Sequence, residues 1–247
     1  MAVLLSARNV SKRYGAVQAL DSVSLDISEG ECVALVGGNG AGKSTLVAII
    51  AGLQVPDAGA LVVKGQAANF HSPQDARSAG IQTVYQTLAL CDNLSAVGNL
   101  FLGRELAVGV GPFKFVRRRA MLDQTAATLR DLGLRFTDLG AATANFSGGQ
   151  RQGLAFARAV GSAPSLLVLD EPTAALGVAE RERVIQTVHH LHRDRGIAVL
   201  LITHNLEEMR RLADRVVVLR HGKSVGTFPI GEADDDTLVG FITGARR

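Results

Sequence analysis

The sequence has few of the residues on which several classes of protein depend. It contains no tryptophan, aromatic residues make up 4%, and only two of its 247 residues are cysteine. So few aromatics disfavour a protein that recognises its partners mainly through aromatic hot spots. Cys32 and Cys91 lie far apart without metal-ligand spacing, so we expect reduced thiols rather than a disulfide framework or a metal site.

Long hydrophobic runs are also missing. No stretch approaches the about 20 apolar residues that a membrane-spanning helix needs. The apolar start, Met1–Leu5, is too short for the hydrophobic region of a signal peptide. We therefore expect a soluble globular protein that stays in the compartment in which it is made.

Charge of one sign is not in large excess. The chain has 26 Lys and Arg against 23 Asp and Glu, for a net charge of +3. Short basic runs could meet nucleic acid or anionic lipid, but solvated helix faces are the commoner explanation of such runs. They are Arg117–Arg119, Arg210–Arg211 and Arg246–Arg247. We expect no nucleic-acid partner.

A glycine-rich segment carries the strongest chemical signal. Cys32–Val36 is a short apolar run without helical spacing, typical of a strand buried on both faces of a parallel sheet. The next residues, Gly37 to Ser44, match G-x-x-x-x-G-K-[ST]. Glycines there let backbone N–H groups point at an anion, and the helix that follows adds the positive end of its dipole. We predict a nucleoside triphosphate site, with Lys43 on the β- and γ-phosphates and the Ser44 hydroxyl on Mg²⁺.

Further strand patterns surround this segment and indicate an α/β fold. They are Leu4–Val10, Val23–Ile27, Ala60–Val63, Ile81–Val84, Leu166–Leu169, Ala198–Ile202, Val216–Leu219 and Ser224–Phe228. The first two suggest that the sheet begins before residue 31, and the last two predict a closing hairpin.

The middle of the chain has a different pattern. From Thr87 to Gly161 the strand signals stop, and Arg117–Leu132 has a helical apolar period. Gly103–Pro112 is rich in glycine and predicts a flexible connection. We therefore predict a single domain over 1–247, in which 1–86 and 162–247 form the α/β nucleotide-binding core and 87–161 form an inserted helical subdomain.

A second anion site is predicted where Ser147, Gly148, Gly149 and Gln150 open a helix. Serine followed three residues later by glutamine forms a capping box, which alone indicates only a well-started helix. The two glycines, however, would let a ligand approach the helix N-terminus closely.

Two carboxylates, Asp170 and Glu171, directly follow the apolar run Leu166–Leu169. Burying them at the end of a strand costs free energy unless a cation or hydrogen-bonded water compensates their charge. We assign Asp170 to Mg²⁺ and Glu171 to the orientation or deprotonation of a water molecule. His204 follows another apolar run, so it belongs to the edge where α/β sheets bind ligands.

Three further histidines, His189, His190 and His192, lie on a predicted amphipathic helix, Val178–Arg195. No carboxylate or cysteine completes a metal site with them. We interpret them as residues of a solvent-facing surface.

Together these stretches resemble the nucleotide-binding subunit of ABC transporters over essentially the whole chain. Gly37–Thr45 is similar to the family's Walker A motif, Phe146–Gln150 to its signature motif and Leu166–Glu171 to its Walker B motif with the catalytic glutamate. The resemblance implies an ABC ATPase fold, with a mainly parallel sheet, an antiparallel β subdomain and an inserted helical subdomain, and it implies ATP and Mg²⁺ as cofactors.

The same resemblance assigns roles to individual residues, including a Q-loop glutamine, a switch histidine and an aromatic residue that stacks on adenine. The implied catalytic residues are Glu171, His204 and Gln86. The implied nucleotide-binding residues are Tyr14, Gly37, Asn39, Gly40, Ala41, Gly42, Lys43, Ser44, Thr45, Ser147, Gly148, Gly149 and Gln150. The implied metal ligands are Ser44, Gln86 and Asp170.

The resemblance further implies a head-to-tail dimer, of two copies or with a like cassette, that encloses two ATP molecules. Ser147 and Gly149 would contact the γ-phosphate bound by the partner chain, and hydrolysis would open the dimer and move integral-membrane permease subunits. The implied location is the cytoplasmic face of the membrane, with a sugar-binding protein as an indirect partner. Phe146 stands where the family more often has leucine, and Gly177 where it usually has an aspartate at the dimer seam.

One branch of the family is the most similar. Thr83–Gln86, Leu94, Asn99, Phe101–Glu105 and Ala174–Gly177 look like bacterial importers of simple sugars such as ribose, xylose or fructose. That branch often fuses two cassettes, whereas this sequence holds one.

Three other functions remain possible at this stage. An ABC importer subunit for a non-sugar solute would share every motif described. A soluble ABC ATPase acting on nucleic acid or ribosomes would carry a long coiled coil or a second cassette, and the sequence has neither. A P-loop GTPase or small-molecule kinase would leave the Ser147 helix without a role, and the N-K-x-D guanine motif is missing.

Overall fold

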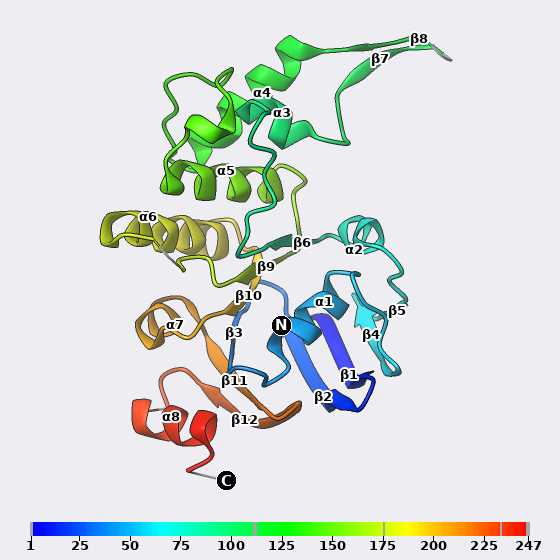
Figure 1. Cartoon of the computed structure of the whole chain (residues 1–247), viewed down its shortest axis with the longest axis vertical. Coiled ribbons are helices and arrows are strands. Elements are labelled where there is room, and N and C mark those ends of the chain that lie inside the picture. Colours follow the sequence, from blue (N-terminus) through cyan, green and yellow to red (C-terminus); the bar gives the residue numbers. More distant parts are fainter. Residues whose placement is uncertain (1, 111–112, 175, 233, 246–247) are drawn as a thin grey trace.

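The computed structural model describes residues 2–110, 113–174, 176–232 and 234–245 (Figure 1). Its strands are β1 (Val3–Tyr14), β2 (Val17–Ser28), β3 (Cys32–Val36), β4 (Ala58–Val63), β5 (Gln66–Ala68), β6 (Ile81–Val84), β7 (Ala107–Val110), β8 (Phe113–Val116), β9 (Leu166–Asp170), β10 (Ala198–Ile202), β11 (Arg215–Arg220) and β12 (Lys223–Pro229). Its helices are α1 (Lys43–Ile50), α2 (Pro73–Ser78), α3 (Ala96–Phe101), α4 (Arg118–Asp131), α5 (Gly148–Val160), α6 (Val178–His189), α7 (Leu206–Leu212) and α8 (Asp235–Thr243), with a 3₁₀ turn η1 (Thr143–Asn145) and a π-helical turn η2 (His190–Asp194).

A six-stranded sheet in the order β12-β11-β3-β10-β9-β6 forms the centre of the molecule. Its strands pair in parallel except for β12, which pairs antiparallel with β11. Every residue of β3 and β10 is buried, as the continuous apolar runs of these strands predict for the inner part of a parallel sheet. The predicted fold class, an α/β core with a mainly parallel sheet, is confirmed.

A separate antiparallel sheet has the order β2-β1-β4-β5. The prediction that the central sheet begins before residue 31 is therefore wrong, because β1 and β2 belong to this second sheet. Along much of β2 buried and exposed residues alternate, as they do in a strand with one solvated face. The antiparallel β subdomain implied by the family resemblance is thus present.

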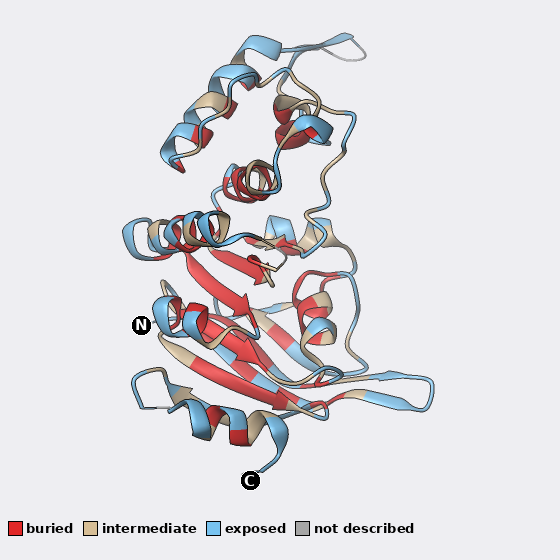
Figure 2. Cartoon of the chain, turned by 60° about the vertical axis from the view of Figure 1, so that its left-hand side comes forward, coloured by how far each residue is buried: buried red, intermediate tan, exposed pale blue. Residues whose placement is uncertain are grey.

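The central sheet separates two hydrophobic cores, because alternate residues of a strand point to opposite faces. On β3, Cys32, Ala34 and Val36 belong to one core, and Val33 and Leu35 to the other. Helices α5, α6 and α7 complete the first core, and α1 with the antiparallel sheet completes the second. Figure 2 shows the buried strands between these layers.

The middle of the chain contains α3, α4 and α5, but it is not wholly helical. The prediction that strands stop between Thr87 and Gly161 is wrong, because β7 and β8 form a two-stranded antiparallel ribbon. The predicted flexible connection Gly103–Pro112 contains β7, although Gly111 and Pro112 lie outside the described residues. Gly109 serves this pairing: its φ is +143°, and a Cβ on it would lie 1.8 Å from the carbonyl oxygen of Phe113.

The interpretation of three solvent-facing histidines holds for His189 but is wrong for His192, which is only 3% exposed. His192 lies in the π-helical turn η2, whose wider spacing shifts the helix face that points inward. Its Nε2 atom lies 3.3 Å from Oδ2 of Asp214. Burial lowers the pKa of His192, and the charge of Asp214 opposes this shift.

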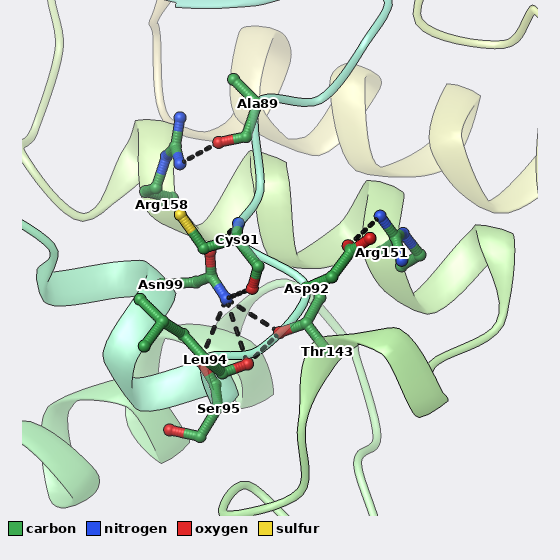
Figure 3. A network of polar contacts seen from close by, with 9 residues as sticks. All are labelled: Ala89, Cys91, Asp92, Leu94, Ser95, Asn99, Thr143, Arg151 and Arg158. Carbon is green, nitrogen blue, oxygen red and sulfur yellow. Dashed lines mark hydrogen bonds and ion pairs between the residues drawn. The ribbon is translucent and has the colours of Figure 1, made fainter.

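Asn99, at the centre of a buried polar network, joins the segment before α3 to the segment before α5 (Figure 3). Its Oδ1 accepts a hydrogen bond from the N–H of Cys91 at 2.8 Å, and its Nδ2 donates to Oγ1 of Thr143 at 2.8 Å. The Thr143 hydroxyl in turn donates to the carbonyl of Leu94 at 2.7 Å. Asn99 and Thr143 are both fully buried, so their polar atoms depend on one another.

Replacing Asn99 with alanine should therefore be costly. Asn99→Ala leaves the N–H of Cys91 and the hydroxyl of Thr143 without one of their partners, and we expect a loss of about 3 kcal/mol in the free energy of unfolding. Chemical denaturation followed by circular dichroism measures this change. The neighbouring exposed Asn93 provides the control, since Asn93→Ala should change stability by less than about 0.5 kcal/mol. Equal effects of the two substitutions would contradict the assigned role of Asn99.

Candidate functional site

The glycine-rich loop between β3 and α1 is built from backbone conformations and contacts that only glycine accepts. Gly37 and Gly42 have φ values of +156° and +105°. A Cβ on Gly37 would lie 2.3 Å from the carbonyl oxygen of Leu219, and one on Gly42 would lie 2.6 Å from that of Ala19. No side chain caps the start of α1 and its first turn has no acidic residue, so the N–H groups there are available to an anion.

Two distant segments hold this loop in place. The N–H of Gly222, in the turn between β11 and β12, donates to the carbonyl of Ala41 at 3.0 Å. The N–H of Asp21 on β2 donates to the carbonyl of Gly222 at 2.8 Å. Tyr14 lies at the end of β1, paired with β2, and its ring is 45% exposed with Nζ of Lys12 at 5.8 Å from the centroid.

Lys43 interacts electrostatically with Asp170, the last residue of β9, and with Glu171, which follows it. Its ammonium group donates to the carbonyls of Gly37 and Gly38 at 2.8 and 3.0 Å. Burial lowers the pKa of Lys43, while the negative charges of Glu171 and Asp170 oppose this shift. Burial also raises the pKa of Asp170, with a further contribution from Glu171, and Lys43 opposes it.

One cation and two anions thus share this edge of the sheet, which leaves a local excess of negative charge. A divalent cation would relieve it and would oppose the rise in the pKa of Asp170. The available donors are the hard oxygen atoms that Mg²⁺ prefers, and Mg²⁺ typically takes one or two carboxylates together with substrate phosphates. The residues therefore fit Mg²⁺.

Glu171 is held in an unusual backbone conformation. Its φ of +49° lies in the left-handed region, which costs roughly 1–2 kcal/mol for a residue other than glycine. Its N–H donates to the carbonyl of Ile202 at 2.9 Å, and its Oε1 lies 3.2 Å from Nδ1 of His204. Seven other described residues apart from glycine share this region of backbone conformation, and among these eight only Glu171 is a predicted site residue. Strain of this kind persists where the surrounding structure enforces it.

The sequence did not indicate Glu208, a buried residue that contacts the segments carrying Glu171 and His204. Its side chain is only 2% exposed and accepts hydrogen bonds from the hydroxyls of Thr173 and, at 3.0 Å, Thr203. One buried carboxylate thus joins the segment after Glu171 to the segment before His204. In the sequence, Glu208 stands three residues after Asn205 and looks like the last residue of a capping box. In the structure Asn205 caps the helix and Glu208 points inward.

Gln86 and the Ser147 segment lie in different surroundings. Gln86 is exposed in the turn after β6, and Val84 of β6 pairs with Leu169 of β9, so Gln86 belongs to the same sheet edge as Asp170. Ser147 starts α5 through the predicted capping box with Gln150. Figure 1 shows α5 beyond β6 and β9 from α1. Among the described residues, no hydrogen bond or ion pair joins 147–150 to the phosphate loop.

Apart from Tyr14, which lies on β1 of the antiparallel sheet, the predicted site residues therefore form two groups. The first group lies at the carboxyl edge of the central sheet and contains the loop residues Gly37, Asn39, Gly40, Ala41, Gly42, Lys43, Ser44 and Thr45, followed by Gln86, Asp170, Glu171 and His204. The second group is the start of α5, Ser147, Gly148, Gly149 and Gln150.

Gly149 and Gly177 both border Glu180, another residue that the sequence did not indicate. A Cβ on Gly149 would lie 2.7 Å from Cγ of Glu180, and one on Gly177 would lie 2.7 Å from its Oε2. The carboxylate thus occupies the space beside Gly177, where the family usually has an aspartate. Ala175, in the same run, lies outside the described residues.

A phosphate loop between a buried strand and a helix, with two carboxylates and a histidine at the same sheet edge, defines a P-loop NTPase. Residues 20–174 match the ABC transporter family model. The chain therefore belongs to the ABC transporter family, and it is an ATPase that serves ATP-driven transport. Within the described residues, no helix is long and apolar enough to cross a bilayer.

Relatives and solved structures agree with this assignment. The xylose/arabinose import ATP-binding protein of Sulfolobus acidocaldarius is 45% identical over 91% of this chain and 88% of that protein. The fructose import ATP-binding protein of Rhizobium meliloti is 41% identical over 98% and 95%. A ribose import ATP-binding protein of Rubrobacter xylanophilus is 38% identical over 99% of this chain but only 48% of its own length. A dimeric ATP-binding cassette in a post-hydrolysis state, bound to ADP and Pi, superposes with a TM-score of 0.78 at 26% identity, covering 92% of this chain and 99% of that one.

We predict that Glu208 positions the catalytic edge. Glu208→Gln should slow ATP hydrolysis by about tenfold, because the segments that carry Glu171 and His204 lose their common support. ATP affinity should change little, since Glu208 does not contact the phosphate loop. Steady-state hydrolysis and equilibrium ATP binding measure the two effects. Glu207→Gln changes the adjacent, exposed carboxylate and serves as the control. Parallel losses of hydrolysis and binding in Glu208→Gln would contradict a positioning role.

Proposed function

We propose that this chain powers an ABC importer of a simple sugar. Two copies, or one copy with a like cassette, would close on ATP and open after hydrolysis. The names of the relatives, which refer to xylose/arabinose, fructose and ribose import, support the sugar class. One observation carries the proposed mechanism. Within one chain, the start of α5 lies apart from the phosphate loop and the catalytic edge, so it would serve a nucleotide bound by another chain.

We assign the nucleotide to the phosphate loop, with Lys43 on its terminal phosphates and Tyr14 stacked on adenine. Ser44, Gln86 and Asp170 would hold Mg²⁺, which supplies charge neutralisation at the phosphates when bound. Glu171 would orient or deprotonate the attacking water. The 3.2 Å contact between Glu171 and His204 supports a role for the histidine in fixing that carboxylate.

The helix start at Ser147 would complete the site of the partner chain. Ser147 is exposed, no acidic residue lies in the first turn of α5, and Gly148 and Gly149 add no bulky side chain. Such a helix start is suited to a phosphate. The solved dimer of a related cassette, which covers 92% of this chain, supports the arrangement.

We assign a cavity of about 360 Å³ as the binding site of a permease segment. It lies between α2, β6, the end of α3 and the end of α5, and Arg77, Arg104 and Arg158 line it without any carboxylate among its lining residues. Burial lowers the pKa of Arg104, and repulsion by Arg158 and Arg77 adds to the shift. An acidic side chain or a helix C-terminus of a partner would relieve this repulsion.

The location follows from this partner. We assign the chain to the cytoplasmic face of the membrane, with 87–161 as the subdomain that carries the second anion site and part of the cavity. The extracytoplasmic sugar-binding protein would act on this chain only through the permease.

The dimer is testable with Glu171→Gln. This variant should bind ATP but hydrolyse it about 10²–10⁴-fold more slowly, the usual worth of a general base. Trapped Mg-ATP should then hold two chains together, so light scattering should show an ATP-dependent dimer. Adding Ser147→Arg to the same chain should abolish the dimer without abolishing ATP binding. A Glu171→Gln chain that stays monomeric with saturating Mg-ATP and its membrane partners present would overturn the composite site.

The cavity makes a separate prediction. Among the described residues, the Arg77 side chain donates hydrogen bonds only to the Gln74 side chain in its own helix, so Arg77→Glu should leave the fold intact. Because it reverses the charge that a partner would meet, it should reduce recovery of integral-membrane proteins in pull-downs from detergent-solubilised membranes by about tenfold. Arg130→Glu, on the exposed surface of α4, is the matched control. If both variants retain the same membrane partners as the unmodified chain, the permease does not use this cavity.

A further inference from the structure

The ribbon formed by β7 and β8 exposes an apolar face. Val108 pairs directly with Phe115, and side chains alternate along each strand, so Val108, Phe113 and Phe115 share one face while Lys114 lies on the other. Phe113 is 72% exposed, Phe115 69% and Val108 51%. Figures 1 and 2 show the ribbon extending from the upper part of the molecule without a neighbouring element over it.

Such a ribbon is poorly stabilised by itself. Two strands without a third strand or a covering helix are at best marginally stable in water. Large exposed apolar side chains gathered on one face, rather than scattered singly, mark an interaction surface. The structure therefore contains a surface that needs a partner, apart from the nucleotide site and from the arginine-lined cavity.

Positive charge surrounds this apolar face. Residues 113–119 are all exposed and include Lys114, Arg117, Arg118 and Arg119 but no acidic residue. Within the part of the chain that the structure describes, no ion pair involves any of these four cations. The basic run Arg210–Arg211 differs, because Arg210 pairs with Asp235 and Arg211 with Glu182. The positive charges at the ribbon are thus not neutralised by ion pairs with other described residues.

A lipid bilayer with anionic headgroups offers both features that this surface requires. Its interface accepts aromatic and aliphatic side chains at the boundary of the acyl layer, while its phosphates attract Lys and Arg just outside. The exposed cations beside the apolar face are thus complementary in charge to an anionic lipid surface, and the apolar face is complementary to its acyl boundary.

The position of the ribbon agrees with this choice. The arginine-lined cavity is lined in part by Leu102, Gly103 and Arg104, and β7 begins at Ala107, only three residues later. In Figure 1 the ribbon extends toward the same side of the molecule as α2, which also borders the cavity. A permease segment seated in the cavity would bring this side of the chain toward the bilayer.

We propose that the β7–β8 ribbon and the first residues of α4 bind the surface of an anionic phospholipid bilayer, with Phe113 and Phe115 inserted at the interface and Arg117–Arg119 on the lipid phosphates. This inference rests on the proposed function for the presence of a membrane and for the side of the chain that faces it. Binding to lipid alone requires neither a permease nor ATP hydrolysis, so the two proposals fail independently.

Flotation of the full chain with vesicles tests the proposal. The chain should bind vesicles that mix phosphatidylcholine with phosphatidylglycerol on the order of a hundredfold more strongly than vesicles of phosphatidylcholine alone. Added salt should weaken the binding, because exposed charges are screened. Phe115→Ser and Arg118→Glu should each reduce binding about tenfold without changing ATP hydrolysis. All of these positions are exposed, so the variants should fold.

Two matched controls separate the ribbon from general changes in polarity and charge. Val178→Ser changes another exposed apolar residue, 86% exposed, and Arg135→Glu reverses another exposed arginine. Both should bind vesicles like the unmodified chain. Equal binding by the ribbon variants and the controls would overturn the proposal. The proposal would also be overturned if the ribbon substitutions reduced binding only to vesicles that contain a permease. Self-association in solution that disappears in Phe115→Ser would assign the surface to a second copy instead.

Discussion

The parallel register of β3, β10 and β9 is the constraint on which the catalytic edge depends. Ile202 pairs with Leu35 on one side and with Asp170 on the other, so three strands from distant parts of the chain end at the same level. The phosphate loop follows the end of β3, and Asp170 and Glu171 lie at the end of β9. His204 lies just beyond the end of β10. A shift of one residue in either pairing would turn the buried side chains of a strand to the opposite core and would misplace the group that follows it. The hydrophobic cores on both faces therefore fix the geometry of the site.

Much of this arrangement could be predicted because it is written in local patterns. Apolar runs such as Cys32–Val36 and Ala198–Ile202 have no polar residue that would suit an exposed face, and both are strands with the predicted bounds. Gly37, Gly40 and Gly42 all have positive φ values, so the steric limits on the backbone explain why the loop has glycine at these positions. The serine and glutamine of the second helix start form the capping box that their spacing predicts. In each case the residues that make the structure are neighbours in the sequence.

The features that could not be predicted depend on contacts between distant segments. Glu208 has the spacing of a capping residue, and only the approach of Thr173 and Thr203 reveals its role as a buried support. His192 follows the helical period of its neighbours until the π-helical turn carries it inward. The ribbon of β7 and β8 was hidden because glycine usually interrupts strands, whereas Gly109 is needed for the close approach of the two strands. The sequence pattern was ambiguous at these positions, and tertiary packing decided the outcome.

The bond between Ala41 and Gly222 has a consequence for how the protein matures. The loop that receives phosphate is formed early in the chain, but the turn that holds its carbonyl lies between β11 and β12. During translation the loop emerges from the ribosome well before this turn exists, and it lacks one of its supports until β11 and β12 have been made. We expect nucleotide affinity to appear only after this turn has formed, so that chains without it do not compete for ATP or for a place in the transporter.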